Sequence, residues 1–438
     1  MQPGVAVDGF LLGKKIHAGG MGDIFEVTKP GDSRRMIMKV PRVGPNEPGE
    51  GIISFETEAT IVPALTGPHV PPFVAAGDLA RTPYLVTEWI DGPSLDTVLR
   101  GGRLPAVEVA RIGAAIADAL HSLHQQDVIH LDVKPANIIL KKDGHAALVD
   151  FGFAHHARYP DLLAEETRFG AGSAPYISPE QILGTREDPR SDIFSLGVVL
   201  YEMATGELPF GEPDTDVRNR LWLDPVPPSQ HVDDIPPWLQ EVILRCLEPK
   251  PDARYQSAAL VAFDLRNPDQ VVLTARATKK KRAKFFQQVR RLMKARGEYG
   301  PRLRFPHVLV SRSPIVMVVV DTSVTDDESL TTVRRATERM LSLNKEYRLI
   351  CVSLVPAGPP ADEARRQLEH LVRLRHWIES LQIPPQRLSL HAIESSDPAE
   401  AIVEFARRNN VDLIVLGAGR GFAAPVAAKA HCSVHVVR

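Results

Sequence analysis

The sequence predicts two domains of different fold classes, an α+β domain with a strand-rich and a helical lobe, followed by an α/β domain. Up to about Val40, short apolar segments surround a cluster of glycines, which indicates strands and tight turns. From Pro105 onward, apolar residues recur every three or four positions, which indicates helices. From Pro314, strand-like and helix-like segments alternate, which is typical of a doubly wound parallel sheet. A chain of 438 residues, 44% of them hydrophobic, can bury two separate cores.

The first domain should divide into a small lobe at residues 1–90 and a helical lobe at residues 91–268. In the small lobe, the apolar run Met-Ile-Met predicts a strand that leads into Lys39. In the helical lobe, residues 193–201 are almost all apolar, which predicts a helix buried on every side. An earlier helix should bury one apolar face, which consists of Val109, Ile112, Ile116, Leu120 and Leu123.

Composition excludes several classes of protein. The formal net charge is −2, so the whole chain has no field that would draw it onto nucleic acid. No segment has the roughly 18 apolar residues of a membrane span, and the first ten residues lack a secretory signal pattern. We therefore expect a cytoplasmic protein. The cysteines are far apart, which favours reduced thiols over a disulfide framework or a zinc site.

A series of short motifs carries the chemistry of the first domain. Their order and spacing resemble the signature set of the protein kinases, and of the bacterial Ser/Thr kinases in particular, over roughly the first 265 residues. The resemblance implies the two-lobed protein-kinase fold. In chain order the motifs are HAGGMGDI at 17–24, the lysine at 39, FETEA at 55–59, YLVTEWIDG at 84–92, HLDVKPAN at 130–137, DFG at 150–152 and GSAPYISPE at 172–180.

The resemblance implies a site that binds the phosphates of ATP. The backbone amides of Gly19 and Gly22 would close over these phosphates. Lys39 would bind the α- and β-phosphates and pair with a glutamate of the following helix, Glu58 by family spacing. Glu56 is the alternative partner, because two residues so close in sequence cannot both face inward on a helix.

The adenine ring of ATP would bind next to this phosphate site. By resemblance, Thr87 is the gatekeeper residue. Glu88 and Ile90 would hydrogen-bond the ring through their backbone atoms, and Ile24 and Ile139 would be its apolar walls.

The resemblance also implies which residues carry out the reaction. Asp132 would accept the proton of the substrate hydroxyl, and Lys134 would steady the γ-phosphate and the attacking oxygen. Asn137 and Asp150 would hold Mg²⁺, which neutralises charge on the phosphates. The Lys-Pro-Ala-Asn sequence resembles Ser/Thr kinases rather than Tyr kinases.

By resemblance, Ser173 takes the place of a threonine that contacts the catalytic aspartate and lysine. Three further residues have structural roles in the family: Glu180 and Arg254 would form a buried ion pair, and Asp192 would support the backbone of the catalytic loop.

Three residues depart from the family pattern. His17 replaces the first glycine of the loop, Ile37 replaces a small residue above the adenine, and Leu131 replaces an arginine. These departures favour, slightly, an alternative function as a pseudokinase, a scaffold that binds nucleotide without turnover. The intact catalytic and metal-binding residues favour an enzyme more strongly, because a scaffold has no physical need of all of them.

The activation loop, residues 153–172, is expected not to be switched mainly by phosphate. In many kinases the arginine that Leu131 replaces binds a phosphorylated residue of this loop. Thr167 is the candidate phosphorylation site, but the two glutamates before it would repel a phosphate. Activity would then be set by the C-terminal domain or by association. The competing explanation is that Arg158 or Arg168 replaces the missing arginine.

A basic linker is expected at residues 269–306. An apolar face on residues 285–293 is consistent with an amphipathic helix, which could lie on an anionic membrane surface or pack on one of the domains. Specific nucleic-acid binding is not expected, since it would rest on the linker charge alone. The basic residues are Lys279, Lys280, Lys281, Arg282, Lys284, Arg290, Arg291, Lys294 and Arg296.

The C-terminal domain, residues 307–438, resembles the universal stress protein family. The motifs are VDTS after the first strand, DLIVLG at the fourth and CSVHVVR at the end. Family members that bind nucleotide have glycines continuing well beyond the fourth strand. Here Gly417, Gly419 and Gly421 occur, but residues 422–431 contain no glycine, so the phosphate-binding loop is expected to be truncated and ATP binding weak.

Taken with the resemblance, the residues favour an ATP- and Mg²⁺-dependent Ser/Thr kinase that acts on protein substrates. The C-terminal domain would sense a signal, recruit substrate or form a homodimer. The sequence does not identify the substrate or the stimulus.

Overall fold

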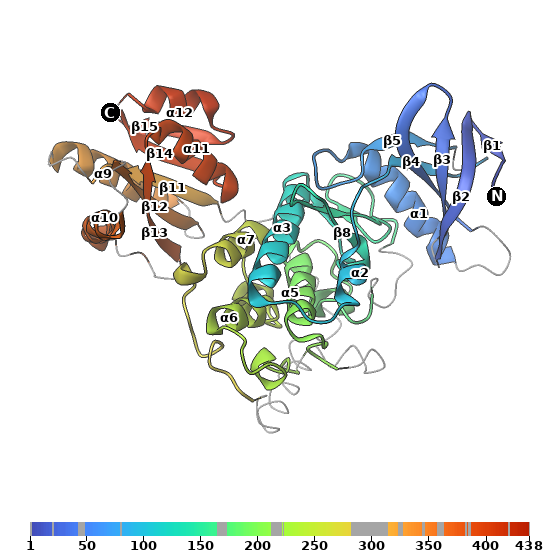
Figure 1. The fold of residues 1–438 in the computed structure, drawn as a ribbon, viewed down its shortest axis with the longest axis horizontal. Helices are drawn as coiled ribbons and strands as arrows, with labels where there is room; N and C mark the ends of the chain where they lie inside the picture. The colour runs from blue at the N-terminus through green and yellow to red at the C-terminus, as the bar shows by residue number, and fades with distance from the viewer. Residues whose placement is uncertain are drawn as a thin grey trace. The chain divides into compact units, whose positions relative to one another are not determined.

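In the computed structural model, the chain forms two compact units (Figure 1). Unit 1 consists of Met1–Arg266 and Leu273–Val310, and unit 2 of Asn267–Val272 and Ser311–Arg438. The structure describes the chain apart from residues 1, 20–21, 43–48, 79–80, 164–172, 212–220, 222, 282–313, 323–326, 344–346, 357–362, 382, 384–386, 419–420 and 438.

The described strands of the small lobe form one antiparallel sheet. Its spatial order is β1 (Ala6–Val7), β2 (Phe10–Gly19), β3 (Gly22–Lys29), β4 (Asp32–Val40), β6 (Leu85–Glu88) and β5 (Phe73–Ala76). Helix α1 (Gly49–Ile61) follows β4 in the chain. Alternate residues of these strands are buried in a shared core, among them Phe25, Val27, Met36, Met38 and Val86. The strands and turns expected near the N-terminus are therefore confirmed.

The other face of this sheet carries several of the predicted site residues. Ile24 on β3 lies opposite Lys39 on β4, and Ile37 on β4 lies opposite Thr87 on β6. Residues paired across antiparallel strands point to the same face, as do residues two apart on one strand. These four side chains therefore share the face opposite the lobe core.

The helical lobe is built from α2 (Leu95–Leu99), α3 (Ala106–Gln125), α4 (Pro179–Ile182), α5 (Arg190–Thr205), α6 (Pro237–Cys246) and α7 (Ala258–Arg266). The apolar face predicted for α3 is buried. The helix predicted at 193–201 is α5, in which nearly every residue is buried. Two short antiparallel strand pairs lie among these helices, β8 (Ile138–Leu140) with β9 (Ala146–Leu148) and β7 (Val128–Ile129) with β10 (His155–His156).

Short 3-10 helices connect several of these elements. In unit 1 they are η1 (Val62–Ala64), η2 (Pro135–Asn137), η4 (Pro228–Gln230) and η5 (Pro251–Ala253). In unit 2 they are η6 (Pro268–Gln270) and η8 (Glu379–Leu381).

Part of the predicted linker, residues 274–277, is docked on the helical lobe of unit 1, whereas residues 269–272 belong to unit 2. The buried carboxylate of Glu241 accepts the backbone N–H of Thr274 at 2.9 Å and that of Ala277 at 3.1 Å. The neighbouring Gln240 donates to the carbonyl of Ala277 at 3.2 Å. The predicted amphipathic helix at 285–293 lies outside the described residues.

Unit 2 contains a parallel sheet, as the alternating pattern predicts. Its order is β13 (Leu388–Ser395), β12 (Arg348–Pro356), β11 (Ile315–Val320), β14 (Leu413–Gly417) and β15 (Ser433–Val437), and the described neighbours all pair in parallel. The chain builds outward from β11 in one direction and then in the other, which is the doubly wound arrangement. The helices are α9 (Asp327–Leu343), α10 (Glu363–Ile378), α11 (Pro398–Arg408) and α12 (Ala423–Lys429).

The core of unit 2 lies on the sheet. Helices α9 and α10 contribute Val333, Leu374 and Trp377 to an apolar cluster with Val318 and Cys351 of the strands. Cys246 and Cys351 are buried free thiols and Cys432 is a partly buried one, which is consistent with the expectation of reduced cysteines.

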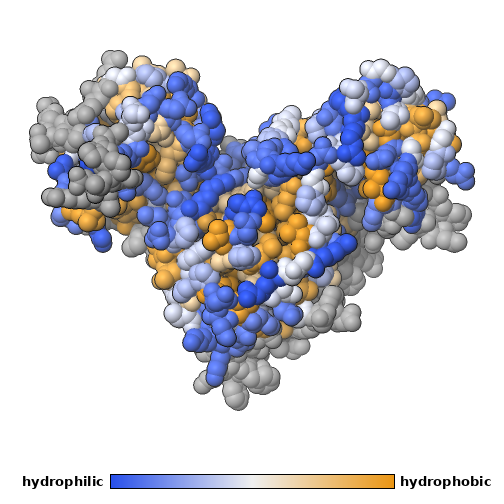
Figure 2. Space-filling view, in the orientation of Figure 1, coloured by the Kyte–Doolittle hydropathy of each residue, from blue (hydrophilic) through white to orange (hydrophobic). Residues whose placement is uncertain are grey.

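The surface of the chain is mixed in polarity. On the face drawn in Figure 2, hydrophilic and hydrophobic residues are intermixed over both units. Within the part of the chain that the structure describes, no helix combines the length and apolar character needed to cross a membrane.

Candidate active site

A buried three-residue charge cluster connects three elements of unit 1. Lys39 on β4 contacts Glu58 of α1, with Nζ and Oε2 2.5 Å apart, and Asp150, with Nζ and Oδ1 2.8 Å apart. The Lys39 side chain is only 12% exposed. Burial alone would lower the pKa of Lys39, but the two carboxylates outweigh it and raise that pKa. The cluster therefore holds a permanent cation.

The two carboxylates of this cluster differ in their environment. Burial raises the pKa of Glu58, and the attraction of Lys39 offsets this only in part. Burial acts in the same direction on Asp150, but there Lys39 prevails and lowers the pKa. Asp150 therefore stays negatively charged, as a metal ligand must.

The cluster also fixes the position of α1. Glu58 Oε1 accepts the backbone N–H of Phe151 at 3.3 Å, so the helix is tied to the segment after Asp150. A Cβ atom on Gly152 would lie 2.1 Å from Ser54 Oγ, so a larger residue at 152 would force the Ser54 hydroxyl of α1 to move. The structure thus pairs Lys39 with Glu58, which sequence spacing favoured over Glu56.

A second polar cluster surrounds Asp132. The Asp132 residue is 2% exposed and its carboxylate accepts three hydrogen bonds. Lys134 Nζ and Asn137 Nδ2 donate to Oδ2 at 2.7 and 2.9 Å, and the backbone N–H of Ser173 donates to Oδ1 at 2.9 Å. Lys134 also donates to Ser173 Oγ at 2.7 Å. The predicted catalytic pair is therefore in direct contact.

Buried side chains of the helical lobe form hydrogen bonds with the backbone of the catalytic loop. The buried carboxylate of Asp192 accepts the N–H of His130 at 2.9 Å and that of Leu131 at 2.8 Å. Gln181 Nε2 donates to the carbonyl of Leu131 at 2.8 Å. These bonds hold Leu131 at a φ of 59°, a left-handed conformation that costs energy in a non-glycine residue. Such strain is common beside functional groups, and here it directs Asp132 toward its partners.

The oxygen atoms expected to bind magnesium are oriented by the same contacts. Asn137 turns its amide nitrogen toward Asp132, donating to the backbone carbonyl at 3.0 Å as well as to the carboxylate. Its amide oxygen is therefore directed away from Asp132. Asp150 has a φ of 66° and keeps 28% of its side chain exposed. Both residues are thus able to offer an oxygen to a ligand.

Several residues expected to bind the nucleotide line up along β2 and β3. Gly19 and Gly22 are paired across these strands, and residues 20–21 between them lie outside the described part. Gly22 has a φ of 147°, and a Cβ on it would lie 2.5 Å from the carbonyl oxygen of Val40. Ile24 and Ile139 are half-buried, as the walls of a cleft would be.

In the segment expected to bind adenine, one backbone N–H group already forms a hydrogen bond within the protein. Glu88 donates its backbone N–H to the carbonyl of Pro72 at 2.9 Å, so its carbonyl is the backbone group it could offer to a ligand. Its side chain pairs with Arg34 at 2.8 Å. Thr87 is buried, and Ile90 lies just after the strand.

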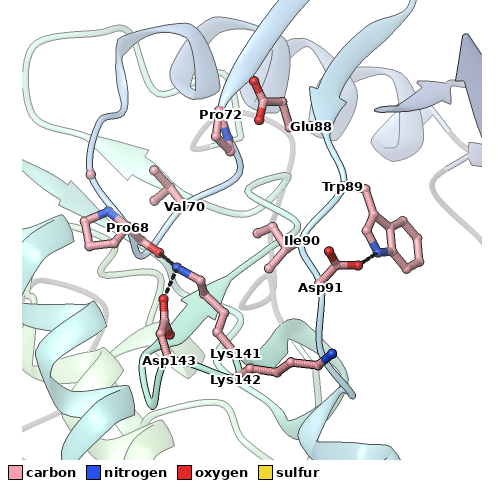
Figure 3. A pocket seen from close by; sticks show the side chains of 11 residues that line it. Pro68, Val70, Pro72, Glu88, Trp89, Ile90, Asp91, Lys141, Lys142 and Asp143 are labelled. Atoms are coloured by element: carbon pink, nitrogen blue, oxygen red, sulfur yellow. Dashed lines mark hydrogen bonds and ion pairs between the residues drawn. The ribbon is translucent and has the colours of Figure 1, made fainter. Parts of the chain in front are cut away.

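A cavity of about 390 Å³ borders this segment (Figure 3). Glu88 and Ile90 line it, but Lys39, Asp132 and Asp150 do not, so it is not the phosphate-binding part of the site. Figure 3 shows Lys141 directed toward Asp143 and the Pro68 carbonyl, at 3.0 and 3.3 Å. The other lining residues are Gly67, Val70, Pro72, Trp89, Asp91 and Lys142.

The residues that depart from the kinase pattern occupy different environments. His17 is exposed, Ile37 is half-buried opposite Thr87, and Leu131 is 2% exposed. Thr167 and Arg168 lie outside the described residues. Arg158 forms an ion pair with Asp127 at 2.7 Å rather than with the catalytic loop.

The structural residues expected from the family are in place. Arg254 forms a buried ion pair with Glu180, with nitrogen to oxygen distances of 2.6 and 2.8 Å. Two further contacts were not expected from the sequence: Tyr176 donates to Glu202 at 2.7 Å, and Arg186 pairs with Asp161 at 2.8 Å. Their charged members look like surface residues in the sequence, and no local pattern indicates that they are partners.

In unit 2, the glycines after β14 are partly described. Gly417 ends β14, Gly421 has a φ of 68°, and residues 419–420 lie outside the described part. Helix α12 begins at Ala423 and ends at Lys429.

Models of known protein families match both the first domain and the C-terminal domain of the chain. The protein kinase domain model matches residues 10–264, and the model of the universal stress protein family matches residues 314–438. The serine/threonine-protein kinase PknB of Mycolicibacterium smegmatis is 36% identical over 266 residues, which is 59% of this chain and 42% of that protein. The PknB of Mycobacterium leprae is 35% identical over 265 residues, with the same coverage. This chain thus spans less than half the length of these curated relatives.

The crystal structure of the PknI kinase domain of Mycobacterium tuberculosis covers 61% of this chain and 98% of its own, with 24% identity and a TM-score of 0.49. The family assignment rests on the match over residues 10–264, which is more than half of the chain. The chain belongs to the protein kinase family and carries a universal stress protein domain after its kinase domain.

Proposed function

We propose that this chain is a Ser/Thr protein kinase that transfers the γ-phosphoryl group of ATP to hydroxyl groups of protein substrates. The observation that carries the proposal is the presence of two charged clusters, Lys39 with Glu58 and Asp150, and Asp132 with Lys134. The first cluster presents a cation for phosphates, and the second presents a carboxylate for a hydroxyl proton. A kinase reaction needs both at once.

In the proposed reaction, the substrate oxygen attacks the γ-phosphorus while the bond to the β–γ bridging oxygen breaks and ADP leaves. The proton of the hydroxyl passes to the Asp132 carboxylate. Lys134, 2.7 Å from that carboxylate, holds positive charge where the γ-phosphate and the attacking oxygen meet. Ser173 orients both groups, because its backbone N–H and its hydroxyl bond to Asp132 and Lys134.

Magnesium fits the residues that would hold it, Asp150 and Asn137. Mg²⁺ prefers oxygen ligands and is commonly bound by one or two carboxylates together with substrate phosphates. Across the described ranges, no group of three or more His, Cys, Asp or Glu residues could hold a metal by itself, so the phosphates of ATP would complete the site. When bound, the ion neutralises negative charge on the phosphates.

ATP would bind with its adenine ring between Ile24 and Ile139. The Glu88 carbonyl and the backbone of Ile90 would hydrogen-bond the ring, and Gly19 and Gly22 would bring backbone amides to the phosphates. The half-buried state of both isoleucines supports this placement.

We further propose the domain boundaries 1–268, 269–306 and 307–438, with the C-terminal domain acting in regulation or as a homodimer contact. A weak contact of the basic linker with an anionic membrane surface is part of the same proposal. The kinase and stress protein matches at 10–264 and 314–438 support the two domain limits.

The test is an assay of the purified full chain with Mg²⁺, γ-labelled ATP and peptide mixtures that contain Ser, Thr or Tyr as the only hydroxyl residue. We expect label on Ser and Thr peptides and little on Tyr peptides. ATP binding without label on any peptide, or on the chain itself, would show a nucleotide-binding scaffold instead.

A further inference from the structure

A buried arginine lies in the connection between α4 and α5. Arg186 is 6% exposed, and its guanidinium contacts the described part of the activation loop, residues 153–163. Nε donates to Asp161 Oδ2 at 2.8 Å, and Nη2 donates to the carbonyls of Phe153 and Ala154 at 2.9 and 3.4 Å. One side chain therefore grips the loop at two places that lie several residues apart.

The carboxylate that receives this arginine is held firmly. Besides Arg186, Asp161 contacts His155 Nδ1 at 3.4 Å and accepts the backbone N–H of Leu163 at 3.2 Å. Burial alone would raise the pKa of Asp161, but the nearby His155 imidazole and the Arg186 guanidinium lower it to about 2. The Asp161 carboxylate therefore stays negatively charged throughout the neutral pH range.

The segment that Arg186 contacts is connected to the catalytic loop through a short antiparallel strand pair. His155 and His156 form β10, which pairs with Ile129 and Val128 of β7. Strand β7 leads directly into His130 and the loop that carries Asp132. A change in the position of β10 would therefore be passed to the backbone beside the catalytic carboxylate.

At position 131, the catalytic loop has no cation that could contact the activation loop as Arg186 does. Leu131 is apolar and 2% exposed. Arg158 does not take its place, because that side chain is 77% exposed and pairs with Asp127. Arg186, by contrast, is buried, and its guanidinium contacts the start of the activation loop.

We infer that Arg186 is a positioning residue for phosphoryl transfer, and that its pair with Asp161 orders the first half of the activation loop without a phosphate. The inference rests on the proposed kinase activity. In other proteins a phosphate paired with an arginine can order a loop of this kind. In this chain the permanent pair of Asp161 and Arg186 would take that role. Residues 153–163 would thus be ordered in the unmodified chain.

The experiment compares Arg186→Gln and Asp161→Asn with the double variant in the full chain. The matched control is Arg266→Gln, which removes another arginine–aspartate pair of the same lobe, between α7 and Asp118 of α3. For each protein, kcat and the KM values for ATP and for a peptide are measured on phosphatase-treated enzyme, together with the melting temperature.

We expect Arg186→Gln to lower kcat about tenfold or more, since small misplacements of catalytic groups have large effects, with the KM for ATP changed less than about twofold. Asp161→Asn should act in the same direction, and the double variant should be no slower than Arg186→Gln, because the two residues act as one unit. The Arg266→Gln control should keep kcat within about twofold of wild type.

Two results would overturn the inference. One is a folded Arg186→Gln or Asp161→Asn variant with wild-type kcat. The other is a loss of kcat that Arg266→Gln reproduces at an equal drop in melting temperature, which would show general destabilisation. If Arg186→Gln does not fold, the nearly isosteric Asp161→Asn decides alone. An inactive wild-type chain would instead overturn the proposed function, and the inference with it.

Discussion

Replacement of Lys39 by methionine separates catalysis from folding more clearly than other changes at the site. The ammonium lies 2.5 and 2.8 Å from two carboxylate oxygens, so at an effective dielectric constant of about 20 each attraction is roughly 6 kcal/mol before desolvation is subtracted. Breaking a buried ion pair costs about 3–5 kcal/mol of net stability. Methionine fills a similar volume, so we expect a less stable but folded protein.

Protonation of Glu58 should recover part of this loss at low pH. Burial already raises the pKa of Glu58 above its ordinary value of 4.5, and without Lys39 it should rise further. A group whose pKa is raised in the folded state binds more protons there, so its contribution to stability is present at low pH and is lost as pH rises. Between the folded pKa of Glu58 in the wild type and its higher folded pKa in Lys39→Met, the free energy of unfolding of the variant should fall by about 1.4 kcal/mol per pH unit relative to wild type.

The assays are peptide phosphorylation with labelled ATP and chemical unfolding from pH 5 to pH 8, with Lys14→Met on the surface of β2 as the matched control. We expect Lys39→Met to lose at least about 10²-fold in kcat, as when one electrostatic contact to a reacting group is removed. Transfer at the wild-type rate would refute the role of Lys39. Unfolding with the pH dependence of the wild type would refute the account of Glu58.

Three more predictions concern the loop, the second domain and a buried ion pair. Thr167→Ala should keep most of the wild-type rate, because Leu131 cannot bind a phosphate; a loss greater than about tenfold, or roughly 1.4 kcal/mol of barrier, would favour a phosphate switch. A fragment of residues 305–438 should bind ATP at least several-fold more weakly than glycine-complete relatives, measured by calorimetry, and tight binding would contradict the truncated loop. Arg254→Met should lower the free energy of unfolding by about 3–5 kcal/mol, because it leaves Glu180 buried without its cation; an unfolding curve like that of the wild type would exclude this role.

Much of the fold could be predicted because it depends on local periodicity. The three- and four-residue spacing of apolar residues predicts the buried face of α3, and the all-apolar run predicts the buried helix α5. Alternation after Pro314 predicts the parallel sheet of unit 2. The pairing of β7 with β10 could not be predicted, since two-residue strands carry no periodic pattern.

The candidate site was predictable only where spacing limits the choice. Helix geometry lets only one of Glu56 and Glu58 face inward, and family spacing chooses Glu58. The support of the catalytic loop by Asp192 follows from the family resemblance. The conformation of Leu131 does not, because a left-handed leucine has no sequence signal and depends on Asp192 and Gln181 to hold it.

The pair of Arg186 and Asp161 shows why tertiary contacts between charged residues are missed. The two residues are 25 positions apart, and each is of a type that is usually exposed. Only the fold brings them together and removes them from water. Periodicity and motifs therefore do not indicate which residue a charged side chain pairs with.

The most direct test of the account is the rate of γ-phosphoryl transfer by the full chain and its Asp132→Asn variant. Both are incubated with Mg²⁺, labelled ATP and a Ser/Thr substrate, beside the surface control Asp234→Asn, and ATP affinity is measured in parallel. The account predicts transfer by the wild type and the control, and at least about 10²-fold less by Asp132→Asn with ATP affinity unchanged, because a general base contributes about that much. Equal transfer by wild type and Asp132→Asn, or ATP binding without transfer by the wild type, would contradict it.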